Sequence, residues 1–520
     1  IPRPRALGVD PRNGSLWAVS GPADEAKVLH YGADGRKMPE EISPAGWRPE
    51  GIAVDPEGRI WVADDGPDQQ VKTFGPDGKP AGTLGVKGGI YSGVPGETGP
   101  LKLAGPLGVA VDGAGNVYVA AGAGTGTELR KFGPGGSPLF AKYGLEFIDA
   151  ADADPATDGA DVFTKIHHYR MDYAKPAGEE WTYAGLTLDR FAYPEDIRLH
   201  PHAVKTGGVM VRRRDGRRFM FLAPVHGAPF GIYRFDGEIA IPCGVLAPDW
   251  RRPSSWPSGL PKGYTRWIWI DRDGNGRMDD PNEYEPDSPP VGHTYGWYVD
   301  DNLDIWMASE GARAGQPDVR RYRASLDPNR PEACPVYDRA DVDDFHRGKE
   351  FDPEGEILGV LRARYVSATD TMYLGAYTKT HPKDPNSPEF GMVGREILRY
   401  DDWTGRDPAR SPRSLRWRAT LPYDPAGISK NVIHGAKSMA VAGDRVYAIM
   451  GDTKEILVYD ARTGEPMPGK AMEPGPEVAG RSGFIDVLNG INAFRRADGE
   501  YLVFAEEDGQ AKGLLYRERR

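Results

Sequence analysis

Short runs of alternating apolar and polar residues, separated by glycine turns, recur along the first part of the chain. Three stretches share one pattern: "RALGVDPRNGSLWAVS" from Arg5, "EGIAVDPEGRIWVADD" from Glu50 and "LGVAVDGAGNVYVAAG" from Leu107. Each has an apolar run ending in Val-Asp, a glycine-bearing turn, and a run that alternates aliphatic and aromatic residues. Because successive side chains of a strand point to opposite faces, this period of two predicts strands at about 51–55, 59–64, 108–112 and 116–121.

The pattern repeats as a larger unit. Each copy is followed by another short run that closes on a glycine turn, and units of roughly 45–55 residues with about four strands are typical of β-propeller blades. Weaker copies begin near Thr206, Tyr295, Arg364, Lys437 and Asn492, which brings the number of candidate blades to eight. The sequence therefore predicts an all-β fold, one β-propeller domain over residues 1–520, with eight blades preferred to seven.

Two long segments, at about 140–199 and 248–290, interrupt the repeat. Long excursions from a compact scaffold are usually functional loops or added strands. Their aromatic rings suit either stacking on a flat ligand such as a sugar or packing of the insertions onto the propeller. These rings belong to Tyr169, Tyr173, Trp181, Tyr183, Trp250, Trp256, Tyr264 and Trp267.

The repeated frame resembles NHL-repeat propellers and, more loosely, propellers of the gluconolactonase type. The resemblance covers 5–132 well, and Tyr295–Tyr322 and Lys437–Asp460 less closely. NHL propellers include protein-binding and RNA-binding modules as well as peptidylglycine lyases. The resemblance therefore implies the fold and leaves the function open.

Charge and composition narrow the classes of partner. The net charge is −11, and basic and acidic residues are intermixed, which argues against a nucleic-acid binder. The densest basic run, Arg212 to Arg218, falls on a strand–turn–strand segment, and we expect it to be a solvated hairpin tip. No apolar run reaches the roughly 18–20 residues needed to span a bilayer.

Cysteine use and the chain start bear on the compartment. Cys243 and Cys334 are the only cysteines and lack metal-site spacing, but they could form one disulfide. The sequence begins at Ile1 rather than Met, so we expect a processed form that is exported, either secreted or periplasmic.

The segment "WIWIDRDGNGRMDDPNEY" carries the most specific motif. Asp271, Asp273, Asn275 and Asp279 surround Gly276 in the pattern D-x-D-x-N-G-x-x-D. Calcium takes six to eight oxygen ligands, and side chains at alternate positions of a tight loop supply them. An EF-hand has Glu at its twelfth position, whereas here Asn282 stands there and Glu283 follows. The sequence predicts a structural calcium site, with an acidic turn that binds no ion as the alternative.

Histidines give the second chemical signal. In the repeat frame His202, His293 and His434 stand just before the first strand of a blade, and His226 lies on a loop that opens on the same side. Neutral imidazoles from different blades could bind zinc, copper or iron at the channel mouth, or transfer protons. The alternative is that each histidine caps a loop or packs on an aromatic ring.

Two functions follow from these patterns. The first is an exported metal-dependent enzyme, a lyase or hydrolase, that uses His202, His226, His293 and His434 on a carbohydrate-like or lactone-like small molecule. The second is a non-catalytic recognition scaffold whose loops bind a protein or polysaccharide. We expect no nucleic-acid partner and no membrane span.

Overall fold

The computed structural model describes residues 1–122, 127–144, 150–199, 206–224, 229–247, 256–287, 293–310, 316–330, 332–385, 392–405, 413–425, 435–451, 453–475, 490–507 and 512–518. Within these ranges the chain is almost entirely strand and turn, and the helices are single 3₁₀ turns. These turns are η1 (Ala23–Glu25), η2 (Gly89–Tyr91), η3 (Pro155–Thr157), η4 (Ile197–Leu199), η6 (Pro281–Glu283) and η7 (Ser367–Thr369). None of the described helices is long and apolar enough to cross a membrane.

The chain divides into two compact units. The first contains 1–146, 184–194 and 237–239, and the second contains 147–183, 195–236 and 240–520. In both, neighbouring strands along the chain pair antiparallel, as in a meander.

The first unit holds three four-stranded sheets. The first sheet contains β1 (Pro4–Val9), β2 (Leu16–Ser20), β3 (Lys27–Tyr31) and β4 (Lys37–Ile42). The second contains β5 (Pro49–Val54), β6 (Ile60–Asp64), β7 (Gln70–Phe74) and β8 (Pro80–Leu84). The third contains β9 (Pro106–Val111), β10 (Val117–Ala121), β11 (Thr127–Phe132) and β12 (Pro138–Gly144). β5, β6, β9 and β10 confirm the four predicted strands.

The second unit holds six sheets. The first two contain β13 (Asp152–Ala153), β14 (Asp161–Phe163), β15 (His167–Met171) and β16 (Trp181–Leu186), then β17 (Thr206–Arg214), β18 (Arg217–Pro224), β19 (Phe230–Asp236), β20 (Ile239–Ala247), β21 (Trp267–Ile270) and β22 (Tyr284–Pro286). The next two contain β23 (His293–Val299), β24 (Ile305–Glu310), β25 (Val319–Tyr322) and β26 (Val342–Phe345), then β27 (Ile357–Val366), β28 (Thr371–Thr378), β29 (Glu396–Asp401) and β30 (Ser414–Thr420). The last two contain β31 (Ala436–Ala442), β32 (Arg445–Met450) and β33 (Ile456–Asp460), then β34 (Ile491–Arg495), β35 (Tyr501–Glu507) and β36 (Lys512–Glu518).

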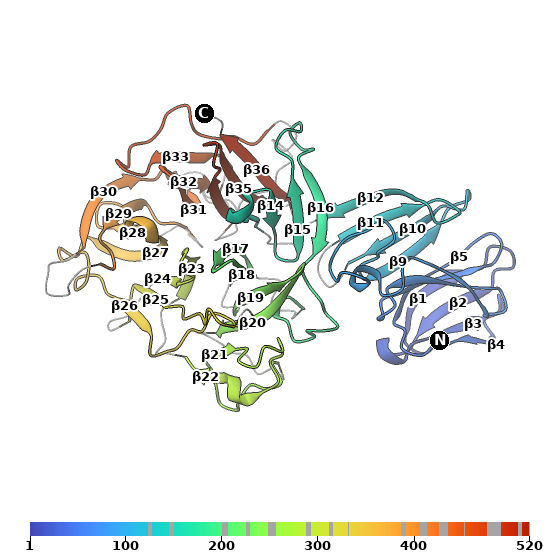
Figure 1. Ribbon diagram of the computed structural model, residues 1–520. Coiled ribbons are helices and arrows are strands. Elements are labelled where there is room, and N and C mark those ends of the chain that lie inside the picture. The colour runs from blue at the N-terminus through green and yellow to red at the C-terminus, as the bar shows by residue number, and fades with distance from the viewer. Residues whose placement is uncertain are drawn as a thin grey trace. The chain divides into compact units, whose positions relative to one another are not determined.

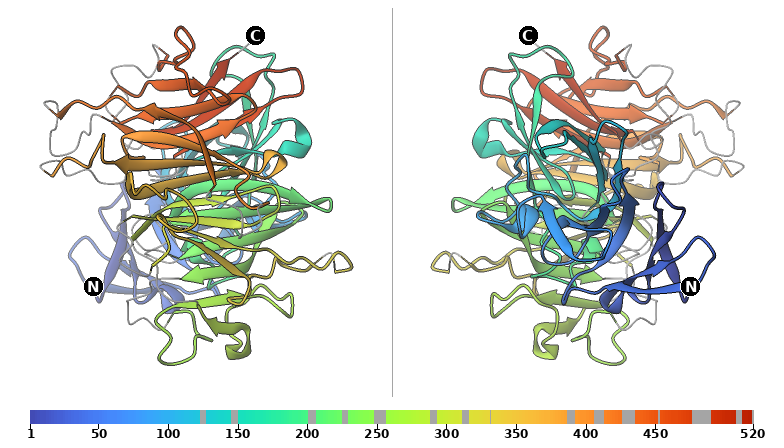
Figure 2. Two further views of the ribbon diagram at one scale, coloured as in Figure 1. Left: turned by 90° about the vertical axis from the view of Figure 1, so that its left-hand side faces the viewer. Right: turned by 90° about the vertical axis from the view of Figure 1, so that its right-hand side faces the viewer.

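The six sheets of the second unit follow one another around a closed ring (Figure 1). Contacts run from β13 to β17, β23, β27, β31 and β34 in turn, and β34 returns to β13. In the turned views, successive sheets of this unit lie one above another (Figure 2). The first strand of each sheet thus faces the middle of the ring, as in a β-propeller. The predicted all-β propeller fold is confirmed.

The eight-blade prediction is not confirmed, because the described residues form nine sheets in two units. Each of the eight predicted repeats forms its own sheet, and the ninth sheet, β13–β16, lies in the segment 140–199 that the sequence marked as an insertion. Its first strand has only two residues and lacks the Val-Asp frame, so the repeat gave no signal there. The second insertion adds β21 and β22 to the sheet of β17–β20. A single domain over the whole chain stays a prediction.

Hydrogen bonds explain the repeated Val-Asp and aromatic frame. The carboxylate of Asp300, at the end of β23, accepts hydrogen bonds from the backbone N–H groups of Asn302 (2.8 Å) and Asp304 (3.1 Å) and from Trp306 Nε1 (2.9 Å). The Asp55 carboxylate likewise accepts from Trp61 Nε1 at 2.9 Å. One carboxylate therefore holds the turn and orients the aromatic side chain of the next strand, as Asp does in an Asx turn.

The basic run of the β17–β18 hairpin is not the solvated tip that the sequence predicts. The turn itself lies at Asp215 and Gly216, as expected, but Arg212 and Arg213 reach back to carboxylates of the neighbouring sheet. Their side chains are only 13% and 28% exposed. The prediction was wrong here because the carboxylates that bind these arginines lie about 60 residues earlier in the sequence.

Candidate metal centre and neighbouring surfaces

Three carboxylates meet in the loop between β21 and β22. Asp271, Asp273 and Glu283 each place an oxygen within 4.8 Å of the others, the one such group in the described part of the chain. Asp271 comes directly after the buried strand β21, and its backbone N–H donates to the Cys243 carbonyl at 3.1 Å. Glu283 ends the turn η6, which Asp280 caps through a 2.8 Å hydrogen bond to Asn282 N.

Backbone N–H groups hold these carboxylates in place. Asp271 accepts from Gly274 N (3.0 Å) and Gly276 N (3.1 Å), and both glycines have positive φ, so the loop turns sharply. Glu283 accepts from Arg272 N (2.7 Å) with Oε1 and from Trp269 Nε1 (3.0 Å) with Oε2. The loop therefore curls around a set of oriented oxygens.

The electrostatics of the cluster favour a cation. Asp271 and Glu283 are 4% and 5% exposed, so both carboxylates are held together largely out of water. Burial, and to a lesser degree the charge of Glu283, raises the pKa of Asp271 to about 7. Burial also raises the pKa of Glu283, with the charge of Asp273 adding to it. A hard divalent cation with oxygen ligands would remove this repulsion.

The other two predicted calcium ligands, Asn275 and Asp279, are not part of the carboxylate cluster. Asn275 is exposed, and its carboxamide oxygen accepts from Arg277 N at 2.6 Å while its amide donates to Asp273 at 2.8 Å. Asp279 is exposed and is not among the three clustered carboxylates. The third carboxylate of the cluster comes from Glu283 instead. Glu283 stands one residue beyond the position of the EF-hand Glu, and this spacing was the sequence feature that could have identified it as a ligand.

The predicted histidine site is not tested by the structure. His202, His226 and His434 lie outside the described residues. His293 begins β23, where its backbone stands opposite Glu310 of β24, but its side chain is also outside the description. A zinc, copper or iron site with His202, His293 and His434 as ligands therefore stays a prediction.

Two further histidines of the second unit, His167 and His168, serve packing. His167 is buried, its ring contacts Tyr169 and Tyr183 edge to face, and burial lowers its pKa to about 4. His168 stacks on Phe163 and bonds Asp161 at 2.9 Å.

Cys243 and Cys334 are both buried in the same apolar cluster and are not joined by a disulfide.

Aromatic side chains gather on β15 and β16. The rings of Tyr169 and Trp181 meet edge to face at 5.7 Å, and Tyr169 lies 5.9 Å from Tyr183, centroid to centroid. Trp181 is 45% exposed, although exposed tryptophan is uncommon in folded proteins. We call Tyr169, Trp181 and Tyr183 the aromatic surface. By contrast Trp267 and Tyr173, from the same predicted set, are buried in the core.

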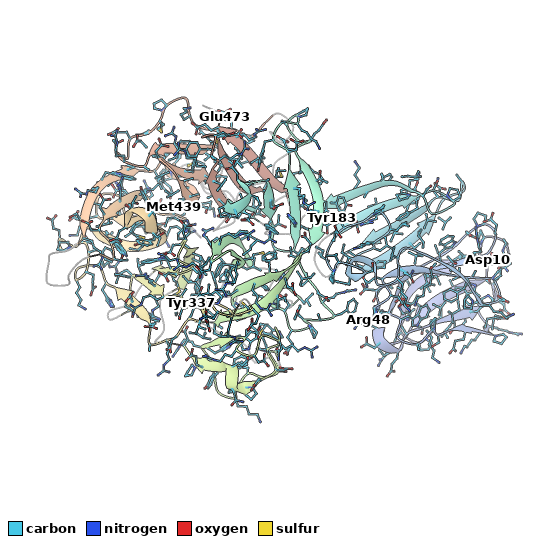
Figure 3. All side chains as sticks on the ribbon, in the orientation of Figure 1. Asp10, Arg48, Tyr183, Tyr337, Met439 and Glu473 are labelled. Atoms are coloured by element: carbon cyan, nitrogen blue, oxygen red, sulfur yellow. The ribbon has the colours of Figure 1, made fainter. Side chains whose placement is uncertain are left out.

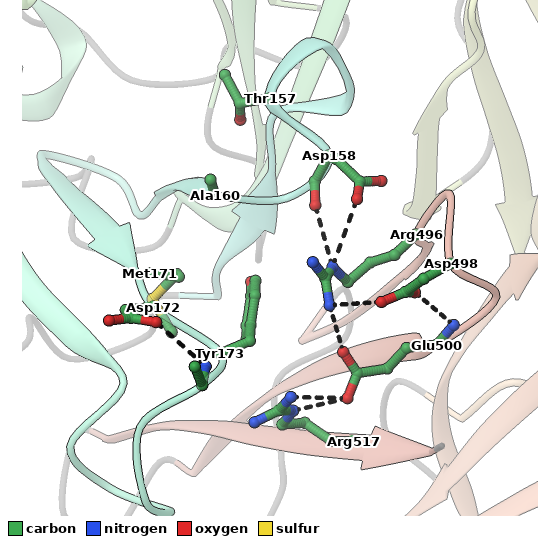
Figure 4. Close-up of a pocket in the computed structure, with 11 residues that line it drawn as sticks. Thr157, Asp158, Ala160, Met171, Asp172, Tyr173, Arg496, Asp498, Glu500 and Arg517 are labelled. Atoms are coloured by element: carbon green, nitrogen blue, oxygen red, sulfur yellow. Dashed lines mark hydrogen bonds and ion pairs between the residues drawn. The ribbon is translucent and has the colours of Figure 1, made fainter. Parts of the chain in front are cut away.

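A pocket of about 680 Å³ lies where the first and last sheets of the ring meet (Figure 4). Its charged side chains pair with one another: Arg496 with Glu500 at 2.6 Å and with Asp498 at 3.1 Å, and Arg517 with Glu500 at 2.8 Å. Both guanidinium groups also lie over the ring of Tyr173, at 4.7 and 5.1 Å. These ion pairs lie within the β34–β36 sheet, whereas Arg496 also pairs with Asp158, in the turn before β14, at 3.6 Å. Together with the contacts on Tyr173, two residues after β15, that pair joins the first sheet of the ring to the last.

Comparison with known proteins supports the fold. An NHL repeat model matches residues 47–74, which span β5 to β7. No curated protein matches the chain significantly. The likeness to gluconolactonase-type propellers stays a prediction.

Solved structures resemble the chain at low identity. A nidogen/laminin complex is 13% identical, with 46% of this chain and 78% of that chain covered and a TM-score of 0.22. A protein of unknown function from Bacteroides caccae is 13% identical, with 46% and 80% covered and a TM-score of 0.20. Hydrazine synthase from Kuenenia stuttgartiensis is 11% identical, with 100% and 96% covered and a TM-score of 0.22. The chain is an all-β propeller protein that carries an NHL repeat in its first unit.

Proposed function

We propose that this chain is a calcium-stabilised β-propeller scaffold that recognises a carbohydrate, in particular a polysaccharide, on the aromatic surface of β15 and β16. The exposed Trp181, with Tyr169 and Tyr183 beside it, is the observation that carries the proposal. Flat rings that keep one face in water suit stacking on the apolar faces of sugar rings. The proposal includes export, since extracellular fluids supply both calcium and polysaccharides.

Binding to polysaccharides tests the recognition role. The full chain is mixed with insoluble cellulose, chitin and xylan, and the bound fraction is measured after sedimentation. We expect retention on at least one of them and a loss of at least tenfold in affinity for Trp181→Ala. Phe140→Ala, which removes another exposed ring, on β12, is the matched control and should bind like the wild type. Equal binding by Trp181→Ala and the wild type would refute the role of this surface.

Calcium is proposed to occupy the loop between β21 and β22, bound by Asp271, Asp273 and Glu283. The three clustered oxygens, two of them on buried carboxylates, support the proposal. An ion that binds only the native state stabilises it by mass action, by about 2.7 kcal/mol when its concentration is a hundred times Kd. The ion would hold the loop in place and, through Asp271 N and Cys243 O, fix the loop to the middle of β20.

Melting curves with and without calcium test this site. Wild type should melt at higher temperature with calcium than with EDTA, whereas Asp271→Asn should melt alike in both. Each protein is compared with itself in calcium and in EDTA, because Asp271→Asn also removes one of the two oxygens that accept from Gly274 N and Gly276 N and so lowers the stability in both conditions. Asp279→Asn is the matched control and should keep most of the calcium response. A calcium response that survives in Asp271→Asn would place the ion elsewhere.

A metal-dependent lyase or hydrolase is the second candidate function. The backbone register favours it, because His293, the first residue of β23, stands opposite Glu310, the last residue of β24, and these residue types can serve as metal ligands or as acid and base. Metal analysis of the purified protein separates the two functions. Stoichiometric zinc, copper or iron that is lost in His293→Ala supports the enzyme, and calcium alone supports the scaffold.

A further inference from the structure

Two arginines from different sheets flank one tyrosine at the middle of the second unit. Arg212 lies on β17, Tyr298 on β23 and Arg364 on β27, and each of these is the first strand of its sheet (Figure 1). The guanidinium carbons of Arg212 and Arg364 lie 5.5 and 5.1 Å from the centre of the Tyr298 ring. Ring closure therefore places two positive charges around one aromatic side chain.

Arg364 has no carboxylate partner in the described chain. Its Nε donates to the Met439 carbonyl at 3.0 Å, and Nη1 donates to the carbonyls of Trp297 (3.3 Å) and Ala363 (3.0 Å). Figure 3 shows Met439 on β31. Nη2 donates to no acceptor among these residues, although Arg364 is only 5% exposed. A buried cation without a counter-ion is costly, which indicates that a negative charge is missing from this place.

Arg212 has one carboxylate partner, Asp152, and the charge of Asp301 also acts on it, so the pKa of Arg212 is raised although burial opposes this. Its Nε donates to the Val299 carbonyl at 2.8 Å, and Nη1 donates to the Val211 carbonyl at 2.8 Å and to Asp152 at 3.1 Å. Asp152 also accepts from the backbone N–H of Val211, so its charge is shared. Nη2 of Arg212 and the hydroxyl of Tyr298 find no acceptor in the described part of the chain. Arg212 keeps 13% of its side chain exposed, so solvent reaches this group.

The surroundings of Arg364 also determine its charge at neutral pH. Burial lowers the pKa of Arg364 to about 10, and the positive charge of Arg212 adds to this lowering. Arg364 therefore stays protonated at pH 7. The lowered pKa reports the same lack of negative charge that the hydrogen bonds show.

We propose that a small oxyanion, the carboxylate or phosphate group of a small molecule, binds at the middle of the second unit's ring between Arg212 and Arg364, with the Tyr298 hydroxyl as a third donor. The planar guanidinium group matches the geometry of carboxylate and phosphate oxygens, and both of these groups lie close to the same tyrosine ring. The site goes beyond the proposed scaffold function and does not depend on the aromatic surface or on calcium.

Calorimetric titration of sodium phosphate and of sodium acetate into the full chain, at pH 7, in a metal-free buffer without chelator and at constant ionic strength, tests the proposal. We expect saturable binding of one anion per chain. Arg364→Met should weaken binding at least tenfold and should melt no lower than wild type without anion, because it removes an uncompensated buried charge. Arg214→Met is the matched control: it removes the same charge from an exposed position of the same strand and should bind like wild type.

The two probes and a second variant make the outcome decisive. Binding of phosphate alone identifies a phosphate-bearing ligand, and binding of both probes identifies a general oxyanion site that includes carboxylates. If Arg364→Met does not fold, Tyr298→Phe keeps the ring and should still weaken binding several-fold. Absence of saturable binding of either probe at millimolar concentration overturns the proposal, as does unchanged affinity in Arg364→Met or in Tyr298→Phe. Because the buffer holds no calcium, the presence or absence of a calcium site does not affect this result.

Discussion

The two units share the same repeated strand frame, but the first strands of their sheets differ in the residues that they carry and in how far these are buried. In the first unit, β1, β5 and β9 carry mainly aliphatic residues and glycine, and the end sheets leave apolar side chains exposed: Leu7 and Val9 on β1 are 55% and 58% exposed, and Leu107 on β9 is 46% exposed. In the second unit, six sheets close into a ring, and its first strands carry Arg212 and Arg364.

The comparison shows what closure adds to a repeat. In a closed ring, every first strand has a neighbour on both sides, so polar side chains can be buried against partners from other sheets. In the first unit, the described sheets contact in sequence from β1 to β5 to β9, and β9 and β1 lack the extensive contact that joins β1 to β5 and β5 to β9. We therefore expect ligand binding in the second unit. Substitutions at equivalent positions of the repeated strand frame should affect the stability of the two units differently.

Glycine four residues before the frame aspartate gives the largest expected difference. A Cβ at Gly296 would lie 2.3 Å from the Leu361 carbonyl oxygen of the next sheet, and one at Gly51 would lie 2.7 Å from the Leu107 oxygen. At Gly108 the nearest atom is Ala120 Cβ of its own sheet, at 3.5 Å. We expect Gly296→Ala and Gly51→Ala to cost about 1–3 kcal/mol or more, as overpacking does.

Gly108→Ala should cost less than about 1 kcal/mol, because 3.5 Å is ordinary van der Waals contact and alanine loses less backbone entropy on folding. Calorimetric unfolding of the three variants measures the differences. A large loss of stability in Gly108→Ala, equal to that of Gly51→Ala, would show that the third sheet has a close neighbour after all.

The frame aspartate gives the second comparison. Asp300 is 1% exposed and accepts from Trp306, whereas the side chain of Asp112 in the first unit is 33% exposed and accepts from Tyr118 at 3.2 Å. Asp300→Asn should cost about 1–3 kcal/mol because a buried acceptor is lost. Asp112→Asn should cost at most about 1 kcal/mol, because water replaces the lost acceptor. Urea unfolding at pH 7 distinguishes them, and equal losses would contradict the burial argument.

The pH dependence of the same pair gives the smallest expected effect. Burial, and then the charge of Asp304, raises the pKa of Asp300 to about 6, whereas the Asn116 side chain lowers the pKa of Asp112. The unfolded pKa of Asp is about 3.9. Between about pH 4 and 6 the native state therefore holds a proton on Asp300 that the unfolded state has released, so this contribution to stability falls as pH rises.

Melting temperatures in EDTA measure this effect. The difference in stability between wild type and Asp300→Asn should be larger near pH 4.5 than at pH 7, since only the wild type loses the contribution over this range. For Asp112 the sign is opposite, because a lowered pKa stabilises the native state above the unfolded pKa and the contribution disappears as pH falls. If the difference in stability between wild type and Asp300→Asn did not change with pH, the raised pKa of Asp300 would be contradicted.

The local pattern of the sequence determined the strands, the turns and the acidic loop. Alternation of side chains placed β5, β6, β9 and β10, and the spacing of Asp271 and Asp273 located the carboxylate loop, because each signal lies within a few neighbouring residues. The Val-Asp frame likewise acts within one hairpin, as the six-residue separation of Asp300 and Trp306 shows. Glu283 was one residue away from the expected ligand position and needed the geometry of η6.

Tertiary structure alone decided how many sheets form, where the ring closes and which charges meet inside it. β13 contacts β34 although more than 300 residues separate them, and Arg364 bonds carbonyls of residues 67 and 75 positions away. Periodicity records which face of a strand is apolar and carries no information on which distant strand will cover that face. For this reason the sequence predicted an exposed hairpin at Arg212. In the structure, ring closure places Asp152 and Tyr298 beside Arg212, and Arg364 on the same tyrosine.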